Sequence, residues 1–347
     1  MAVAIHVVKI FRGAIQGFPR YNMTMLGALK TVALIVAICW TLAAGAQGYP
    51  AKPIRILIGF PAGSTVDILA RPVALRMTEL LGQQVVVDNR AGATGIIANE
   101  LVVKAPADGY TLLATPGSSL TTSPHMHARM TFDVLRDLAP VVQIGAFPLV
   151  LFVHPSVPAK SVKELIALAR ARPGVLTFGS AGFGSGLHLA GELFKSMAAI
   201  DIVHVPYKGG PPAVTDIMGG RIDMMFYTLA VVQQHIKSGR LRALAMSGLT
   251  RDPLVPQLPT ITEAGLPGFE FTGWHGILAP AATPKDIIAK LNATVVGILG
   301  TPAIKEFWAS QGMGFASDNS PAQFAARFRA DYEKSGRLIR AAGLKPE

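Results

Sequence analysis

Strand and helix patterns alternate along most of this chain, and this alternation limits the folds available to it. Residues 53–60 form a short apolar run bounded by Pro and Gly, which predicts a buried strand. Residues 66–81 carry apolar side chains at helical spacing and end at Gly82, as helices commonly do. By the same reasoning strands are predicted at 84–88 and 110–114 and a helix at 96–104. This order predicts an α/β unit with a mostly parallel sheet and helices on both faces.

A second α/β unit of similar style begins after strands at 141–144 and 149–153. Its predicted elements are helices at 161–172, 187–197, 212–218 and 231–237, and strands at 175–180, 201–205, 222–226 and 241–247. The chain is expected to return near 271–280, so that helices at 284–299 and 321–342 pack on the first unit. We therefore expect two domains, residues 47–148 plus 274–347 and residues 149–273, hinged as a clamshell around a ligand cleft.

The N-terminal segment has the pattern of a secretory signal peptide. Lys30 precedes an apolar run over 31–44 and the small residues up to Ala46, which predicts cleavage after Ala46. The alternative is a membrane anchor, but the run is shorter than the ~20 residues that span a bilayer. Residues 1–22 make an unusually long basic region, so the natural start is expected at Met23 or Met25.

Removal of residues 1–46 changes the net charge from +11 to +7, because the segment carries four basic residues and no acidic ones. The one cysteine, Cys39, is lost with it, which suits an oxidising compartment. A moderate positive charge favours anionic ligands through long-range attraction. Basic residues are not clustered with aromatic ones, so nucleic acid is not expected as a partner.

The loop at residues 60–67 joins a predicted strand to a predicted helix. Backbone N–H groups at a helix start lack partners inside the helix and attract anions. An ordinary strand–helix turn is the alternative interpretation. The ligand candidates in this loop are Phe60, Ala62, Gly63, Ser64 and Thr65.

The glycine-rich loop at residues 179–186 precedes a helix of the second unit and offers the same chemistry. A nucleotide-binding G-x-G-x-x-G pattern fails because Leu187 stands at its last position. A hydrolase elbow G-x-S-x-G fails because Phe183 stands two residues before Ser185. The ligand candidates in this loop are Ser180, Ala181, Phe183, Gly184 and Ser185.

Other candidates follow predicted strands or the second loop. They are Thr115, Ser118, His188, Tyr207, Tyr227 and Trp274. His188 and Glu192 lie one helical turn apart, but no third metal ligand lies nearby in the sequence. We therefore expect no metal, no cofactor and no catalytic residue.

Eight segments in register from residue 49 onward resemble one protein family. They are Tyr49–Arg55, Phe60–Gly63 with Asp67, Val87–Gly92, Ala105–Leu113, His154–Pro158, Ala190–Phe194, Val205–Gly209 and Glu263–Gly268. The chain resembles the tripartite tricarboxylate transporter receptors, the Bug family of periplasmic binding proteins. The resemblance implies a periplasmic two-domain, type II-like binding protein that presents a small carboxylate to membrane permease subunits. It also implies that the two loops grip the ligand carboxylate like pincers.

The sequence departs from the family pattern at four positions. Phe183 stands for the usual Asn, Leu187 for the usual first His, Tyr227 for the usual Asp or Asn, and Val66 for the usual Thr. Each change replaces a polar group with an apolar or aromatic one, and no carboxylate is evident for the ammonium of an amino acid. We therefore expect a carboxylic acid with an aromatic or otherwise apolar body, on which Phe183, Tyr227 and Trp274 could stack.

The expected protein is thus a monomeric receptor rather than an enzyme. Two alternatives stay open. An orphan receptor would feed a signalling partner in place of a permease, and a secreted enzyme would turn its ligand over.

Overall fold

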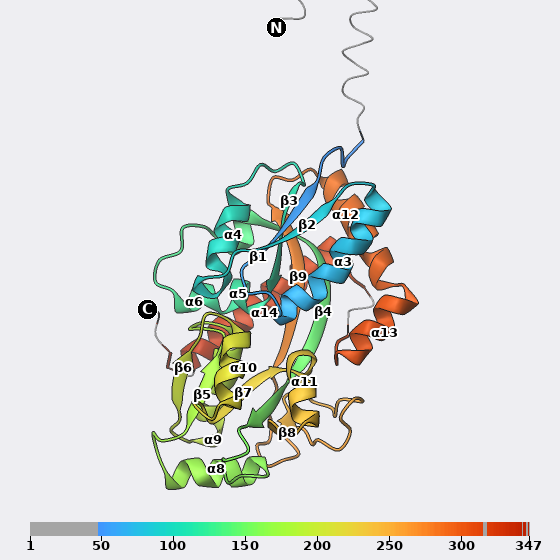
Figure 1. Cartoon of the computed structure of the whole chain (residues 1–347). Helices are drawn as coiled ribbons and strands as arrows, with labels where there is room; N and C mark the ends of the chain where they lie inside the picture. Colours follow the sequence, from blue (N-terminus) through green and yellow to red (C-terminus); the bar gives the residue numbers. More distant parts are fainter. Residues whose placement is uncertain (1–47, 315–317, 342, 345, 347) are drawn as a thin grey trace, which may run out of the picture. The chain divides into compact units, whose positions relative to one another are not determined.

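The computed structural model describes residues 48–314 and 318–346, apart from 342 and 345. The predicted signal peptide, residues 1–46, and the predicted extension, residues 1–22, lie outside these residues. The chain divides into two units, residues 1–51 and residues 52–347, and the fold below is that of the second unit. Figure 1 shows its elements, coloured in chain order.

The strands of this unit join in one mixed sheet. They are β1 (Ile54–Ile58), β2 (Val85–Asn89), β3 (Thr111–Pro116), β4 (Leu138–Val153), β5 (Thr177–Ser180), β6 (Val203–Pro206), β7 (Met224–Thr228), β8 (Arg242–Met246) and β9 (Thr272–Pro280). Their order is β2-β1-β3-β9-β4-β7-β5-β6, and β8 also pairs with β4. The two outer groups, β2-β1-β3 and β7-β5-β6, are parallel as predicted. The strands between them, β9 and β4, are antiparallel to their neighbours.

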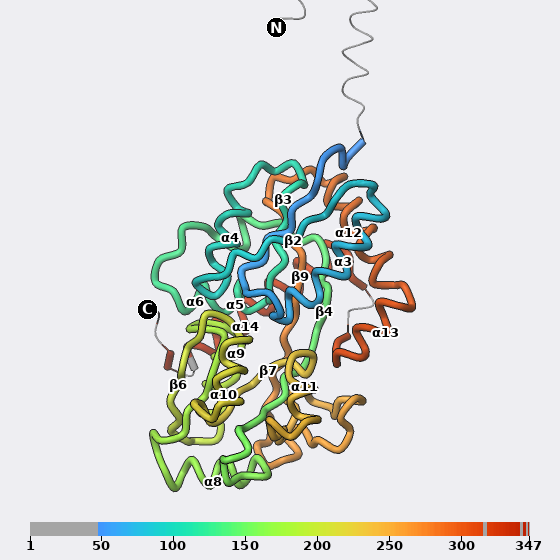
Figure 2. Tube along the Cα trace, in the orientation of Figure 1, coloured from blue at the N-terminus to red at the C-terminus, as the bar shows by residue number. Residues whose placement is uncertain are grey.

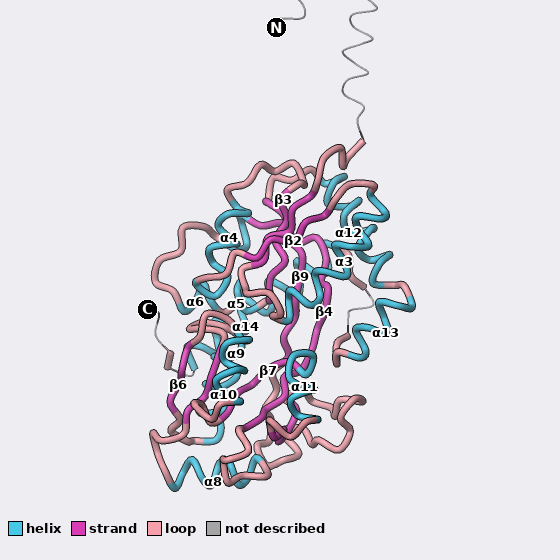
Figure 3. The backbone as a smooth tube through the Cα atoms, viewed as in Figure 1, coloured by secondary structure: helices cyan, strands magenta, loops and turns pink. Residues whose placement is uncertain are grey.

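Strand β4 joins the two halves of the sheet. The sequence predicted two strands here, whereas the structure has one strand of 16 residues. Residues 138–148 pair with β9, and residues 149–153 pair with β7. Figure 3 shows β4 and β9 running side by side through the fold. We call β2, β1, β3, β9 and residues 138–148 the first half-sheet, and residues 149–153 with β7, β8, β5 and β6 the second half-sheet.

The helices cover both half-sheets. They are α3 (Thr65–Leu81), α4 (Ile96–Val103), α5 (Ser118–Thr121), α6 (Ser123–Met126), α7 (Val134–Asp137), α8 (Val162–Ala171), α9 (Gly186–Ala198), α10 (Gly210–Met218), α11 (Leu229–Lys237), α12 (Lys285–Leu299), α13 (Pro302–Ser310) and α14 (Pro321–Ala341), with a 3-10 turn η2 (Ala93–Gly95). As predicted, the C-terminal helices return to the first half: α12 packs on α3 and β4, and α14 packs on β4 and α5. The tube in Figure 2 shows α12 beside α3 although they are far apart in sequence. No single helix among the described residues is long and apolar enough to cross a membrane, although the bent pair α12 and α13 would be by length and composition.

Each half-sheet has its own hydrophobic core. In the first, Leu57, Leu113 and Leu278 pack with Phe324 of α14. In the second, Phe152 and Met225 pack with Ile217 and other apolar side chains of α10 and α11. The apolar residues of the predicted strands and helices therefore fill two hydrophobic cores. The strand ends and helix starts lie outside these cores and can line a binding site.

Candidate functional site

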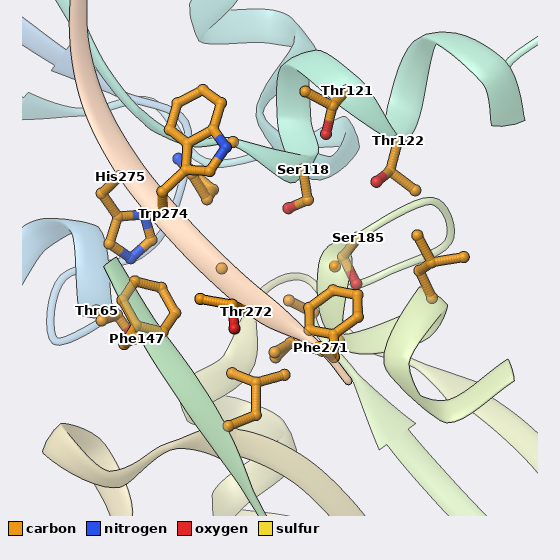
Figure 4. A pocket seen from close by; sticks show the side chains of 18 of the residues that line it. Thr65, Ser118, Thr121, Thr122, Phe147, Ser185, Phe271, Thr272, Trp274 and His275 are labelled. Atoms are coloured by element: carbon orange, nitrogen blue, oxygen red, sulfur yellow. The ribbon is translucent and has the colours of Figure 1, made fainter. Parts of the chain in front are cut away.

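A pocket lies where the two half-sheets meet, and we call it the main pocket. It contains about 1010 Å³ of empty space, open solvent at its mouth included. Figure 4 shows polar side chains of α5 and α9 and aromatic side chains of β4 and β9 around it. Its lining is Phe60, Ser64, Thr65, Val66, Pro116, Gly117, Ser118, Thr121, Thr122, Phe147, Leu149, Ala181, Ser185, Gly186, Leu187, Leu189, Gly210, Tyr227, Thr228, Glu270, Phe271, Thr272, Gly273, Trp274, His275, Asp331, Lys334, Ser335 and Leu338.

Besides the short helix α5, four helices begin at the main pocket. Ser64 and Ser185 are the N-cap residues of α3 and α9, and both line the pocket. Gly210, the first residue of α10, and Thr228, the N-cap of α11, line it as well. The partial positive charge of each helix start favours an anion, and the free backbone N–H groups there can donate to it. The only basic side chains in the described lining of the pocket are Lys334 and His275. The helix starts therefore provide most of the groups that could hold a carboxylate.

The first loop is held in shape by Asp67. Its carboxylate accepts hydrogen bonds from the Gly63 N–H at 3.0 Å, from Arg71 Nε at 2.9 Å and from Asn89 Nδ2 at 3.0 Å. Burial alone would raise the pKa of Asp67, but these hydrogen bonds outweigh burial and hold the pKa below its usual value. Asp67 also forms an ion pair with Arg71, four residues later in α3. It fixes the loop that leads into α3.

The second loop is held by a serine and two histidines. Ser180 Oγ accepts from the Gly182 N–H at 3.0 Å and lies 2.7 Å from His204 Nε2. The ring of His188 stacks on that of His204 with 3.9 Å between centroids, and its Nδ1 accepts from the Gly184 N–H at 3.2 Å. The sequence suggested no serine–histidine pair. Because the Ser180 side chain is fully buried and lines neither of the two pockets described here, this pair supports the shape of the loop.

Half of the predicted ligand residues meet in the main pocket. These are Phe60, Ser64, Thr65, Ser118, Ala181, Ser185, Tyr227 and Trp274. Phe183 and Tyr207 instead line a second pocket, which shares Phe60 and Ala181 with the first. Phe183 is therefore not placed to stack on a ligand in the main pocket, contrary to expectation. Tyr207 is fixed there by donating from its hydroxyl to Asp216 at 2.8 Å.

The remaining predicted residues line neither pocket. They are Ala62, Gly63, Thr115, Ser180, Gly184 and His188. Thr115 is fully buried within the sheet, and His188 is turned toward its own loop. Gly63 and Gly184 have positive φ angles of 75° and 73°, so both serve the turn of their loops.

The two predicted stacking residues of the main pocket are rigidly held. Trp274 is 8 % exposed, packs edge-on against Phe324 and donates from Nε1 to Asp331 at 2.7 Å. Tyr227 is 4 % exposed, and burial raises its pKa while hydrogen bonding to Thr65 opposes the rise. Both rings therefore present fixed apolar surface to the pocket.

Several lining residues were not predicted from the sequence. Phe147, Phe271, Thr272 and His275 come from or adjoin β4 and β9, and Figure 4 shows Phe147 beside His275 and Phe271 near Ser185. Glu270, Asp331 and Lys334 form a charged end, in which Lys334 Nζ lies 3.6 Å from Glu270. Burial raises the pKa of Asp331. Two carboxyl groups thus line a pocket for which the sequence had suggested none.

Comparison with known proteins identifies the family. A family model described as the tripartite tricarboxylate transporter family receptor, TctC, matches residues 69–344. The chain belongs to this family. Its TctC relatives include BugT of Bordetella pertussis, 39 % identical over 293 residues that cover 84 % of this chain and 89 % of that protein. A UPF0065 protein in the tcbD-tcbE intergenic region of Pseudomonas sp. strain P51 is 39 % identical over 319 residues, covering 92 % of this chain and 94 % of that protein.

Solved TctC-like structures share the fold. The R. palustris protein Rpa4515, solved with adipate, is 35 % identical with a TM-score of 0.84 and covers 86 % of this chain and 100 % of that one. MatC from Rhodopseudomonas palustris, solved with bound malate, is 27 % identical with a TM-score of 0.80 and covers 84 % of this chain and 100 % of that one. The periplasmic binding protein BugD is 29 % identical with a TM-score of 0.82, covering 86 % of this chain and 100 % of that one. The chain is therefore a solute-binding receptor of the periplasmic binding protein fold, and the predicted fold class is confirmed.

Proposed function

We propose that this receptor captures a small carboxylic acid with an aromatic or otherwise apolar body in the main pocket. One observation carries the proposal: helix starts from both half-sheets, capped by Ser64 and Ser185, open into a pocket that also presents a group of aromatic and aliphatic side chains, with its charged side chains gathered at one end. The carboxylate would lie at the helix starts and the body against Phe147, Tyr227 and Trp274. The two structural relatives solved with adipate and with malate support the carboxylate part.

The proposed delivery of the ligand depends on a hinge movement between two parts of the chain. We propose that residues 47–148 plus 274–347 move as one body against residues 149–273, because β4 changes its pairing partner between Pro148 and Leu149. Closing of these bodies around the ligand would present it to the membrane permease subunits of a tripartite tricarboxylate-type transporter, as the family's name implies. We propose that the protein acts as a monomer in the periplasm after removal of residues 1–46.

A thermal-shift screen tests this proposal. The purified protein, expressed from the full chain, is heated with benzoate, phthalate, nicotinate, adipate, malate, citrate and an amino acid, with benzamide as the uncharged control. A ligand at a hundred times its dissociation constant should stabilise the protein by about 2.7 kcal/mol. We expect the largest shift with an aromatic acid and none with benzamide.

The other outcomes are informative as well. A shift confined to citrate or to an amino acid would keep the receptor function and contradict the apolar body. No shift with any carboxylate would contradict the binding proposal. Analysis of the incubated ligand by NMR should show no product, and a new product would favour the secreted enzyme instead.

A further inference from the structure

His275 lies in the wall of the main pocket. It belongs to β9, where it pairs with Pro116 of β3 and Gly145 of β4. Its side chain is 4 % exposed, and its ring packs on Phe147 with 4.8 Å between the ring centroids. Figure 4 shows the two rings together at one side of the pocket. The imidazole is thus held firmly and borders the space in which a ligand would lie.

Neither ring nitrogen of His275 has a hydrogen-bond partner among the described residues, although both are buried. Other histidines differ in this respect: His125 hydrogen-bonds to the Tyr332 carbonyl, His188 to the Gly184 N–H and His204 to Ser180. A buried polar group without a partner costs free energy, so such groups are rare in folded proteins. An unpartnered side chain in a pocket wall therefore indicates a ligand group that completes its hydrogen bonds.

The charge state of His275 selects the kind of group. Burial lowers its pKa to about 3, so the ring is neutral wherever the protein works near neutral pH. A neutral imidazole has one N–H donor and one acceptor nitrogen. A hydroxyl group can donate to the acceptor or accept from the donor, whichever nitrogen carries the proton. The apolar analogue of the same ligand would leave both nitrogens unpaired.

We infer that His275 is a specificity-determining residue that hydrogen-bonds a hydroxyl group on the body of the ligand. The receptor then takes a hydroxy-substituted carboxylate in preference to the same acid without the hydroxyl. This inference rests on the proposed function, because it assigns the ligand's carboxylate to the helix starts and the hydroxyl group on the rest of the ligand to His275. A site built around a hydroxyl rejects the analogue that lacks it, since its own polar group is then left without a partner.

Matched ligand pairs and a matched variant test the inference. Isothermal titration compares benzoate with 3- and 4-hydroxybenzoate, and succinate with malate, on the wild-type protein and on His275→Phe. Phe keeps the ring that packs on Phe147 and removes both nitrogens. We expect the wild type to favour the hydroxylated member of at least one pair about tenfold. The variant should favour it less than twofold while it binds the unsubstituted acid at least as tightly.

Three further variants separate recognition from folding. His275→Gln, which keeps a donor and an acceptor, should retain part of the preference. His275→Leu, which removes both nitrogens and stays apolar, replaces His275→Phe if that protein does not fold. His154→Phe, a histidine outside both pockets, should leave the preference unchanged. Binding of carboxylates with no hydroxyl preference, or with a preference that survives unchanged in the variant without the two nitrogens, would overturn the inference and leave the proposed function standing. No binding of any carboxylate would overturn both.

Discussion

The hydroxyl oxygens of Thr65 and Thr228 lie 2.8 Å apart, so one buried hydrogen bond joins the start of α3 to the start of α11. Thr65 follows β1 of the first half-sheet, and Thr228 ends β7 of the second. Both side chains line the main pocket. The contact therefore links the two half-sheets directly at the pocket, and under the proposed closing around the ligand it should contribute to ligand affinity.

Replacing Thr65 by Val keeps the shape of the side chain and removes this bond. The loss of one buried hydrogen bond of about 1 kcal/mol should weaken ligand binding roughly fivefold in isothermal titration. The double variant Thr65→Val with Thr228→Val should lose less than the sum of the single variants, because neither of these two hydroxyl groups is left without the other. Thr294→Val, on an exposed face of α12, is the control. Additive losses would show that the two hydroxyl groups are not coupled.

Gly186, the first residue of α9, lies close to Ser118, the first residue of α5. A Cβ atom at Gly186 would lie 3.0 Å from Ser118 Cβ and 3.5 Å from Phe271 Cζ. Gly186→Ala should therefore hold the halves apart and weaken binding by about tenfold or more, with little change in the free energy of unfolding. Gly297→Ala, in α12 with no atom within 4 Å of the added methyl, should leave binding unchanged and stabilise the protein by about 0.4–1 kcal/mol. Unchanged affinity in Gly186→Ala would mean that binding does not require this approach.

Asp67 is expected to stabilise the fold rather than to bind the ligand. It is 3 % exposed and accepts from Arg71, Asn89 and the Gly63 N–H, so Asp67→Asn should lower the free energy of unfolding by about 1–3 kcal/mol in urea at pH 7. Because the pKa of Asp67 is lowered, its contribution is present above its unfolded pKa, 3.8, and is lost as pH falls through the folded pKa. The variant should therefore lose less stability than the wild type below pH 4. Asp201→Asn, an exposed partner of Lys195, should change stability by less than about 0.5 kcal/mol.

The sequence predicted the elements that depend on local pattern. Helix α3 begins and ends within a residue of its prediction, because apolar spacing and Gly82 mark it directly. The loops at residues 60–67 and 179–186 were predicted for the same reason, because each places glycine and serine residues directly before a helix pattern. Ser64 and Ser185 accordingly line the main pocket.

The residues that line the walls of the main pocket could not be predicted from local sequence pattern. Phe147 and His275 lie in strands in which inward-facing side chains fill either a core or a cavity, and alternation alone does not distinguish the two. Asp331 reaches the pocket only because α14 packs back on β4, a contact between residues far apart in sequence. Phe183 lines the second pocket rather than the main pocket, because this loop faces both cavities and the position of a residue in the loop does not show which of the two it lines.

The buried His275 should make the protein sensitive to mild acid. Burial lowers its pKa to about 3 from the ordinary 6.5, so between these values the unfolded chain binds a proton that the folded protein does not. The free energy of unfolding should therefore fall as pH falls from 6.5 toward 3, by up to about 1.4 kcal/mol per pH unit for this group. Urea unfolding of His275→Phe at pH 7.5, 6, 5 and 4 should show a shallower slope by that amount. Phe147→Leu disturbs the ring that packs on His275 but removes no titrating group, so it should lower stability equally at all four pH values. If the free energy of unfolding depended on pH equally in the wild type and in His275→Phe, the His275 imidazole would take up its proton in the folded protein without loss of stability.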